Sequence, residues 1–171
     1  MKVYLDNVIA SAWVRDDLGP PAERAALQAL RSHTNFELLQ VVTSRESWRE
    51  QERSQNPHVR EELRASRDKT SVVSEDHRVL GFNSVDLGHQ GFISSPLVTD
   101  IVDEALFLNL QALGLKGSDA RHLMYALCNG CVRFVTTDPD FLKRRSAIEA
   151  AYPQIRILLP SELLRDVEQL R

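Results

Sequence analysis

Four acidic residues, far apart in the chain, each stand where a predicted β-strand ends or a predicted helix begins: Asp6, Glu46, Asp119 and Asp138. In an open α/β sheet, the carboxyl ends of the strands meet at one crevice. Carboxylates gathered there repel one another, because like charges at close range disfavour joint ionisation. A hard divalent cation such as Mg²⁺ or Mn²⁺ makes them compatible. If the four acids meet, their chemistry is that of metal-assisted phosphodiester hydrolysis.

Two of these acids also have a simple local explanation as helix caps. Asp6 follows a strand and suits a turn or a helix N-cap, which is a common role for aspartate. Asp138 precedes Pro139, and Asp at the N-cap with Pro at the first helical position is an ordinary helix start. Taken alone, neither residue indicates catalysis.

The other two acids fit the first turn of a helix. Thr43 and Glu46 have the spacing of a capping box, in which Thr43 is the N-cap and Glu46 reaches back to it. Asp119 follows Ser118, the expected N-cap, and its charge complements the helix dipole. These local explanations leave open why all four acids follow strands or begin the helices after them.

The elements that must position these acids alternate between strands and helices. Strands are predicted near residues 3–5, 38–43, 131–136 and 155–159. Helices are predicted near 8–14, 22–32, 44–67, 100–113 and 119–128, then after Pro139, and finally after a Ser161 cap. The segment 44–67 is one helix or two, with a break near Asn56-Pro57, and for 71–95 strand, hairpin and loop stay open. The alternation predicts an α/β fold with a mostly parallel sheet covered on both faces.

Composition limits the function classes. The 171 residues are 43% hydrophobic, which suits one globular domain with a real core. The formal charge is −3, so a nucleic-acid enzyme of this kind needs local basic patches and metal to offset phosphate charge. We see no signal peptide and no apolar run of membrane-spanning length, so we expect a cytoplasmic protein with no membrane partner. Two cysteines do not make a disulfide framework.

A longer motif surrounds Asp119 and Asp138. The runs 117–126 and 130–142 contain an Asp-Ala helix start, a Gly-Cys turn, an apolar strand, and Thr-x-Asp followed closely by Phe-Leu. This pattern resembles the carboxyl-terminal core of a PIN domain. The segments 3–7, 42–46 and 157–164 resemble the first strand, the second acidic position and the close of many PIN chains. We interpret residues 1–171 as one PIN-like domain, with a family-atypical insertion around 49–96.

The resemblance implies a fold, an activity and partners. PIN proteins similar to this chain are mostly metal-dependent ribonucleases with an α/β/α sandwich, and many are the toxin half of bacterial toxin–antitoxin pairs (VapC-like). It therefore implies a three-layer sandwich, an RNA substrate, an antitoxin partner and a homodimer. It also implies that Asp6, Glu46, Asp119 and Asp138 hold Mg²⁺ or Mn²⁺, with Asp6 and Asp119 the first choices as direct ligands. A scaffold that binds RNA or protein without cleaving, and a metal nuclease acting on DNA, are the alternatives.

Neighbouring residues can assist such a site. Candidates to support the ligands are Asn7, Thr136, Thr137 and Asp140, and Asp140 also competes with Asp138 for the fourth position. Candidates to contact RNA phosphates are Lys143, Arg144 and Arg145, for which an exposed helix end is an equal explanation.

Three further motifs have mainly structural explanations. Cys128 and Cys131 have CxxC spacing, but no second pair or His completes a zinc site. His122 lies one turn after Asp119 on the same helix face, and we interpret it as a surface or packed histidine. The arginines at 45, 49 and 53 are interpreted as part of a solvated helix.

Overall fold

A four-stranded sheet organises the chain. The computed structural model describes residues 1–66, 71, 79–80, 97–98 and 101–170. The elements are β1 (Lys2–Leu5), α1 (Asn7–Arg15), α2 (Pro21–Ser32), the 3-10 helix η1 (Thr34–Leu38), β2 (Gln40–Val42), α3 (Arg45–Glu52), α4 (Pro57–Ala65), β3 (Val79–Leu80), β4 (Leu97–Val98), α5 (Glu104–Ala112), α6 (Gly117–Cys128), β5 (Arg133–Val135), α7 (Pro139–Ala151), β6 (Arg156–Leu158) and α8 (Pro160–Glu168). The main sheet has the order β2-β1-β5-β6 and is parallel throughout, while β3 and β4 form a separate antiparallel pair. The predicted α/β class with a parallel sheet is confirmed.

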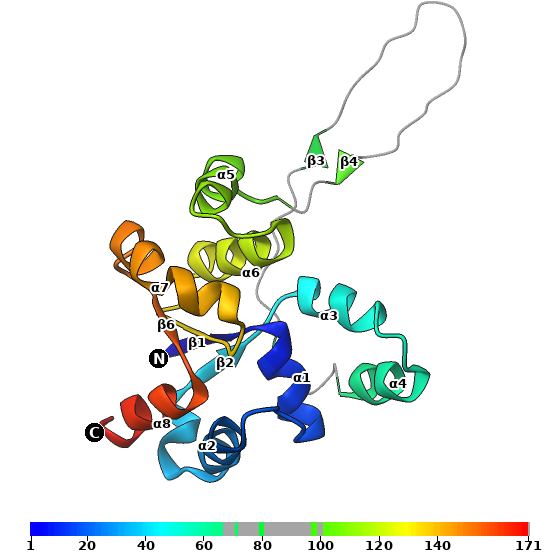
Figure 1. Ribbon diagram of the computed structural model, residues 1–171, viewed down its shortest axis with the longest axis vertical. Coiled ribbons are helices and arrows are strands. Elements are labelled where there is room, and N and C mark those ends of the chain that lie inside the picture. The colour runs from blue at the N-terminus through cyan, green and yellow to red at the C-terminus, as the bar shows by residue number, and fades with distance from the viewer. Residues whose placement is uncertain (67–70, 72–78, 81–96, 99–100, 171) are drawn as a thin grey trace, which may run out of the picture.

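Both faces of the sheet are buried, because successive side chains of a strand point to opposite sides. Tyr4, Phe134 and Ile157 face a core that includes residues of α5, α6 and α7. Val3 and Val135 face a second core with residues of α1, α2 and α8. These helices cover the two faces of the sheet (Figure 1). The result is the three-layer α/β/α sandwich expected when parallel strands are apolar on both sides.

The chain reverses its winding direction at β1. Strand β2 lies on one side of β1, and β5 lies on the other. The helix that follows β1 packs in one core, whereas the helix that follows β5 packs in the opposite core. The carboxyl ends of β1 and β5 therefore form a topological switch point, where open α/β sheets bind ligands. Helices α1, α3, α6 and α7 surround the place where β1 passes into α1 (Figure 1).

The polar segment between β2 and the second half of the chain forms two helices. Asn56 caps α4 by accepting hydrogen bonds from the amides of His58 and Val59, and Pro57 is its first residue. The predicted break at Asn56-Pro57 therefore occurs, because Asn caps and Pro starts a helix. Most of the predicted insertion beyond α4, and most of the uncertain stretch 71–95, lie outside the described residues.

The predicted helix caps at Thr43 and Ser161 are wrong. Helix α3 begins at Arg45 with Ser44 at the N-cap, and the hydroxyl of Thr43 instead donates to the carbonyl of Leu5 (3.1 Å). Helix α8 begins at Pro160, so Ser161 lies inside the helix and its hydroxyl donates to Glu23 across the α2–α8 contact (2.8 Å). In both cases the side chain that the local pattern assigned to a cap instead forms a hydrogen bond with a residue distant in the sequence.

No helix in the described part of the chain is both long and apolar enough to cross a membrane.

Candidate active site

Asp6 lies at the carboxyl end of β1 and caps α1. Its side chain is buried, and both of its oxygens accept hydrogen bonds of 2.7 Å, Oδ1 from the amide of Asn7 and Oδ2 from the hydroxyl of Thr136. Burial raises the pKa of Asp6, while His122, the Thr136 hydroxyl and the Asn7 amide partly counter that effect. Asp6 is thus held in one orientation as an anion that the surrounding protein only partly stabilises. The Thr136 hydroxyl and the backbone amide of Asn7 thus orient Asp6. Their role in supporting a metal ligand stays a prediction.

Asp138 lies three residues beyond the adjacent strand β5. Its amide donates to the Thr136 hydroxyl (2.9 Å), and its Oδ1 accepts from the amide of Asp140 (2.7 Å) as the N-cap of α7. The predicted cap with Pro139 at the first helical position is correct. One hydroxyl, that of Thr136, therefore contacts both Asp6 and the backbone of Asp138, and it sets the two strand ends relative to each other.

Asp119 reaches the same region from α6. The helix begins at Gly117 with Lys116 at the N-cap, so Ser118 is not the cap, and its hydroxyl donates to Oδ1 of Asp119 (3.3 Å). Burial raises the pKa of Asp119, and the charges of Asp138 and Asp6 raise it further. The charges of Asp138 and Asp6 thus disfavour the ionised form of Asp119, because like charges repel at close range. That all four acids form one metal site stays a prediction.

Glu46 has a different environment from the other three acids. Its side chain is 1% exposed and contacts the guanidinium groups of Arg121 on α6 (3.1 Å) and Arg49 on its own helix (3.4 Å). It is not the third residue of a capping box, because α3 begins one residue later than predicted. Arginine charges therefore compensate Glu46, whereas no such ion pair connects Asp119 with a cation among the described contacts.

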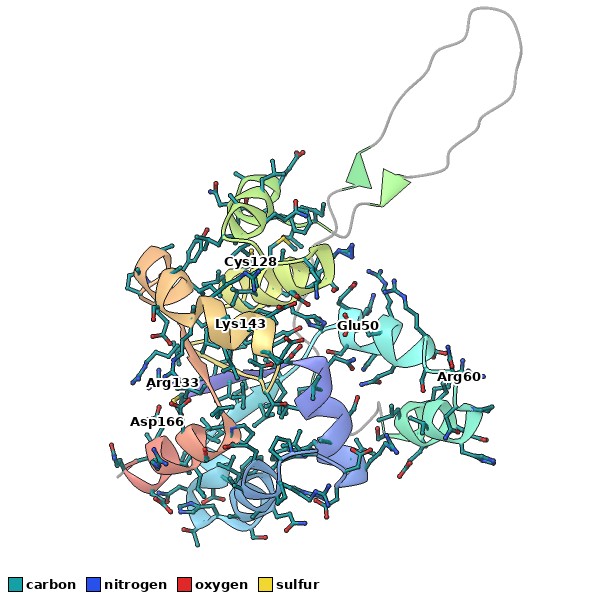
Figure 2. All side chains as sticks on the ribbon, viewed as in Figure 1. Glu50, Arg60, Cys128, Arg133, Lys143 and Asp166 are labelled. Atoms are coloured by element: carbon teal, nitrogen blue, oxygen red, sulfur yellow. The ribbon has the colours of Figure 1, made fainter. Side chains whose placement is uncertain are left out.

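A fifth polar group is centred on His122, which the sequence indicated only as a surface or packed histidine. This side chain is 1% exposed, and its Nδ1 lies 2.7 Å from the hydroxyl of Tyr4. Its Nε2 lies 3.3 Å from Oε2 of Glu50 on α3. Figure 2 labels Glu50, which lies on the side of α3 nearest the centre of the molecule. The spacing of these residues indicated that they share helix faces, since residues three or four apart lie on the same side of a helix. Asp119 and His122 are three residues apart, and Glu46 and Glu50 are four apart.

The carboxylate of Asp140 is paired with a cation. Its carboxylate binds the ammonium group of Lys116 (2.6 Å), and this contact lowers its pKa. Arg144 also donates to the carbonyl of Asp140 (2.9 Å). Asp138 rather than Asp140 therefore interacts with Asp119 and is the better fourth acid.

The three basic residues of α7 have unequal environments. Arg145 donates two hydrogen bonds of 2.8 Å to Glu162 and a further bond of 3.2 Å to Glu149. Lys143 is exposed on α7 (Figure 2). Lys143 is thus accessible to a phosphate, whereas Arg145 is part of the contact between α7 and α8. Thr137 is partly exposed beside Asp138.

The donor atoms at the switch point are suited to a hard cation. They are carboxylate oxygens, and burial together with the charges of Asp138 and Asp6 raises the pKa of Asp119, an effect that Ser118 and Lys116 counter only in part. Within the described ranges, no three His, Cys, Asp or Glu side chains form a group that could hold a metal ion by themselves. Mg²⁺ is commonly bound through one or two carboxylates and keeps several waters, so the three acids fit it without a closed cage.

The cysteines contribute no ligand set. Both are free, and Cys131 is buried, which raises its pKa to about 11. A thiol with such a pKa remains protonated near neutral pH, whereas metals bind the thiolate. The structural explanation of the CxxC spacing is the better one.

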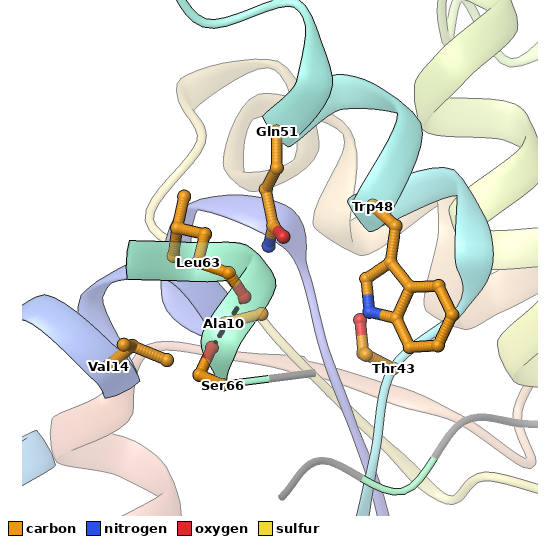
Figure 3. A pocket seen from close by; sticks show the side chains of 7 residues that line it. All are labelled: Ala10, Val14, Thr43, Trp48, Gln51, Leu63 and Ser66. Carbon is orange, nitrogen blue, oxygen red and sulfur yellow. Dashed lines mark hydrogen bonds between the residues drawn. The ribbon is translucent and has the colours of Figure 1, made fainter. Parts of the chain in front are cut away.

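A small cavity lies apart from these acids, between α1, α3 and α4. It has a volume of about 10 Å³ and is lined by Ala10, Val14, Thr43, Trp48, Gln51, Leu63 and Ser66 (Figure 3). That volume holds about one water molecule. The cavity is too small for a substrate, and we assign it no function.

Comparison with known proteins adds no relative. No protein-family model, no curated protein and no solved structure matches this chain.

Proposed function

We propose that this protein is a metal-dependent nuclease, and specifically an endoribonuclease that hydrolyses RNA phosphodiester bonds. The observation that supports it is the position of Asp6 and Asp138 beyond the adjacent strands β1 and β5 of a parallel sheet, where their charges raise the pKa of Asp119 on α6. Folding that brings such charges together costs stability, so their placement is best explained by a cation that binds there. The preference for RNA rests on the resemblance to PIN domains. The antitoxin partner and the homodimer stay predictions of that resemblance.

The residues at the switch point have distinct roles in this proposal. Asp6 and Asp119 would hold Mg²⁺ or Mn²⁺, with Asp138 beside them. When bound, the cation supplies activation of water and stabilisation of charge on the phosphoryl oxygens. Thr136 keeps Asp6 in its orientation through a bond of 2.7 Å. The chain needs no nucleophile of its own for this reaction.

Glu46 and the basic side chains have supporting roles. Glu46 is paired with Arg121, so we place it at the edge of the site, where the pair fixes α3 against α6. Lys143 is the basic residue of α7 that we assign to substrate phosphates, because it is exposed. A contact of that kind positions nucleic acid without reading its sequence.

A cleavage assay tests the proposal. Purified protein is incubated with single-stranded RNA, structured RNA and single-stranded DNA, with Mg²⁺, Mn²⁺ or EDTA. We expect RNA cleavage with either metal, none with EDTA, and a loss of at least about 10- to 100-fold in Asp119→Asn, the range found even for outer partners of metal ligands. Asp17→Asn is the matched control, because Asp17 lies on the exposed α1–α2 connection.

A binding measurement separates the alternatives. Mg²⁺ should raise the melting temperature of the wild type, because a ligand that binds only the folded state stabilises it, and it should have little effect on Asp119→Asn. Cleavage by Asp119→Asn at the wild-type rate would show that the site is wrong. An absence of divalent binding at millimolar concentration would favour the non-cleaving scaffold, and faster cleavage of DNA would favour the DNA nuclease.

A further inference from the structure

A buried carboxylate and two arginines form an ion cluster where α3 meets α6. Each oxygen of Glu46 contacts one guanidinium group, Oε1 at 3.1 Å from Nη1 of Arg121 and Oε2 at 3.4 Å from Nη1 of Arg49. The side chains of Arg121 and Arg49 are 29% and 39% exposed, respectively. Two positive charges and one negative charge leave the cluster positive, although the chain as a whole has a net charge of −3. The cluster is therefore a local positive site for an anion.

Arg121 uses only part of its guanidinium group in this cluster. Within the described residues, the one acceptor that it contacts is Oε1 of Glu46, which receives a hydrogen bond from Nη1. Nε and Nη2 form the adjacent edge of the planar group, and they have no acceptor there. Two parallel N–H donors of this kind match two oxygens of one phosphate group. The edge formed by Nε and Nη2 is thus available to an anion from solvent.

This edge lies beside the switch-point acids rather than between them. A methyl carbon at Gly117 would lie 3.9 Å from Nη2 of Arg121, so the guanidinium group lies along the first turn of α6. Asp119 is in the same turn, but residues two apart on a helix do not face the same side. Arg121 faces α3 instead, through its contact with Glu46. An anion bound at the edge would therefore be a neighbour of the metal site.

A nucleic acid that reaches these acids needs cations on both sides of them. The carboxylates repel its phosphates, and a bound metal ion compensates only the phosphate that it contacts. Lys143 is on α7, which connects β5 with β6, whereas Arg121 contacts α3, which follows β2 at the opposite edge of the sheet. Helices α3 and α7 lie on opposite sides of the start of α1 (Figure 1). The two cations thus flank the acids.

We propose that Nε and Nη2 of Arg121 bind an RNA backbone phosphate next to the one that is cleaved, while Glu46 holds Nη1 and so orients the guanidinium group. The inference rests on the proposed nuclease function and adds a substrate contact to it. It also gives a role to a buried carboxylate that arginines, rather than the other acids, surround. A contact of this kind positions RNA without reading its sequence.

RNA binding without cleavage provides the first test. Fluorescence anisotropy with a labelled single-stranded RNA in EDTA measures the affinity at several salt concentrations, and circular dichroism checks that each variant is folded. Arg121→Ala should weaken binding about tenfold, the effect of one lost hydrogen bond to a charged group, and reduce the dependence of log affinity on log salt by about one unit. Arg121→Lys keeps the charge but loses the fork, so it should also bind more weakly than the wild type.

Arg133→Ala is the matched control for these variants. Arg133 is 22% exposed and pairs with Asp166 at 2.7 Å, but it begins β5 and so lies at the end of the strand away from the acids. Its replacement should leave the affinity for RNA unchanged. Equal losses of affinity in Arg121→Ala and Arg133→Ala would reduce the effect to net charge and overturn the inference.

Cleavage kinetics with Mg²⁺ provide the second test. A contact with a neighbouring phosphate binds substrate and transition state alike, so Arg121→Ala should raise KM and leave kcat nearly unchanged. If Arg121→Ala binds and cleaves RNA as the wild type does, this inference is wrong and the nuclease proposal stands. If the wild type neither binds nor cleaves RNA, the nuclease proposal fails, and this inference fails with it.

Discussion

The hydroxyl of Thr136 donates a hydrogen bond of 2.7 Å to Oδ2 of Asp6 and so connects the carboxyl end of β5 with that of β1. The same oxygen accepts the amide of Asp138 at 2.9 Å. Both contacts are short, and Thr136 is fully buried. One threonine thus sets the relative position of two acids that are 132 residues apart in the chain.

Replacing that hydroxyl should weaken both stability and metal binding. Thr136→Val keeps the shape of the side chain but removes a partner from Asp6 and from the Asp138 amide. We expect the free energy of unfolding to fall by about 1–3 kcal/mol, the usual cost of a buried group left without its partner. The measurement is urea unfolding in EDTA. Thr137→Val is the control, and as a partly exposed neighbour it should change stability by less than about 0.5 kcal/mol. Equal effects at both positions would contradict the role given to Thr136.

Asp119→Asn should make the protein more stable in the absence of metal. Burial and the charges of Asp138 and Asp6 raise the pKa of Asp119, so the folded state binds the proton more tightly than the unfolded chain. The ionised carboxylate therefore destabilises the fold above its folded-state pKa, and this penalty fades as the pH falls toward the ordinary value of 3.8. We expect the variant to gain a few tenths to about 1 kcal/mol at neutral pH in EDTA, because solvent screens a half-exposed group.

Asp140→Asn is the matched control for that measurement, since it should change stability in the opposite direction. The ion pair with Lys116 lowers the pKa of Asp140, so its ionised form stabilises the fold above the ordinary value of 3.8. That contribution is lost as the pH falls through the lowered pKa. Denaturant curves between neutral and acidic pH would record both trends, and an Asp119→Asn variant less stable than the wild type at neutral pH would argue against repulsion at the site.

Variants at Lys143 and Arg145 should distinguish a residue that binds RNA from one that stabilises the fold. Lys143→Ala should leave the unfolding midpoint nearly unchanged but weaken binding of single-stranded RNA. It should also reduce the dependence of log affinity on log salt by about one unit if it contacts one phosphate. Arg145→Ala should lower stability, because Glu162 and Glu149 lose a charged partner. Fluorescence anisotropy at several salt concentrations and thermal unfolding are the two measurements. A stable Arg145→Ala variant with the larger loss of RNA affinity would reverse the assignment.

The predicted elements depended on local rules that the tertiary structure did not disturb. Apolar runs at 3–5, 131–136 and 155–159 became β1, β5 and β6, because a strand buried on both faces must be apolar throughout. Asn56 and Pro57 together start a helix for reasons contained within four residues. By contrast, the capping box at Thr43 and Glu46 failed because each side chain found a stronger partner across the fold, Leu5 and Arg121 respectively.

The sequence by itself determined the α/β class and placed Asp6, Asp119 and Asp138 next to strand ends or helix starts, because periodicity and turn residues act over short distances. It did not determine which charges would be compensated. Only the tertiary structure separated Glu46, paired with Arg121, from Asp119, which meets the charges of Asp138 and Asp6. It also buried His122 between Tyr4 and Glu50. Compensation of charge is a property of distances in space, and residues far apart in the chain set those distances.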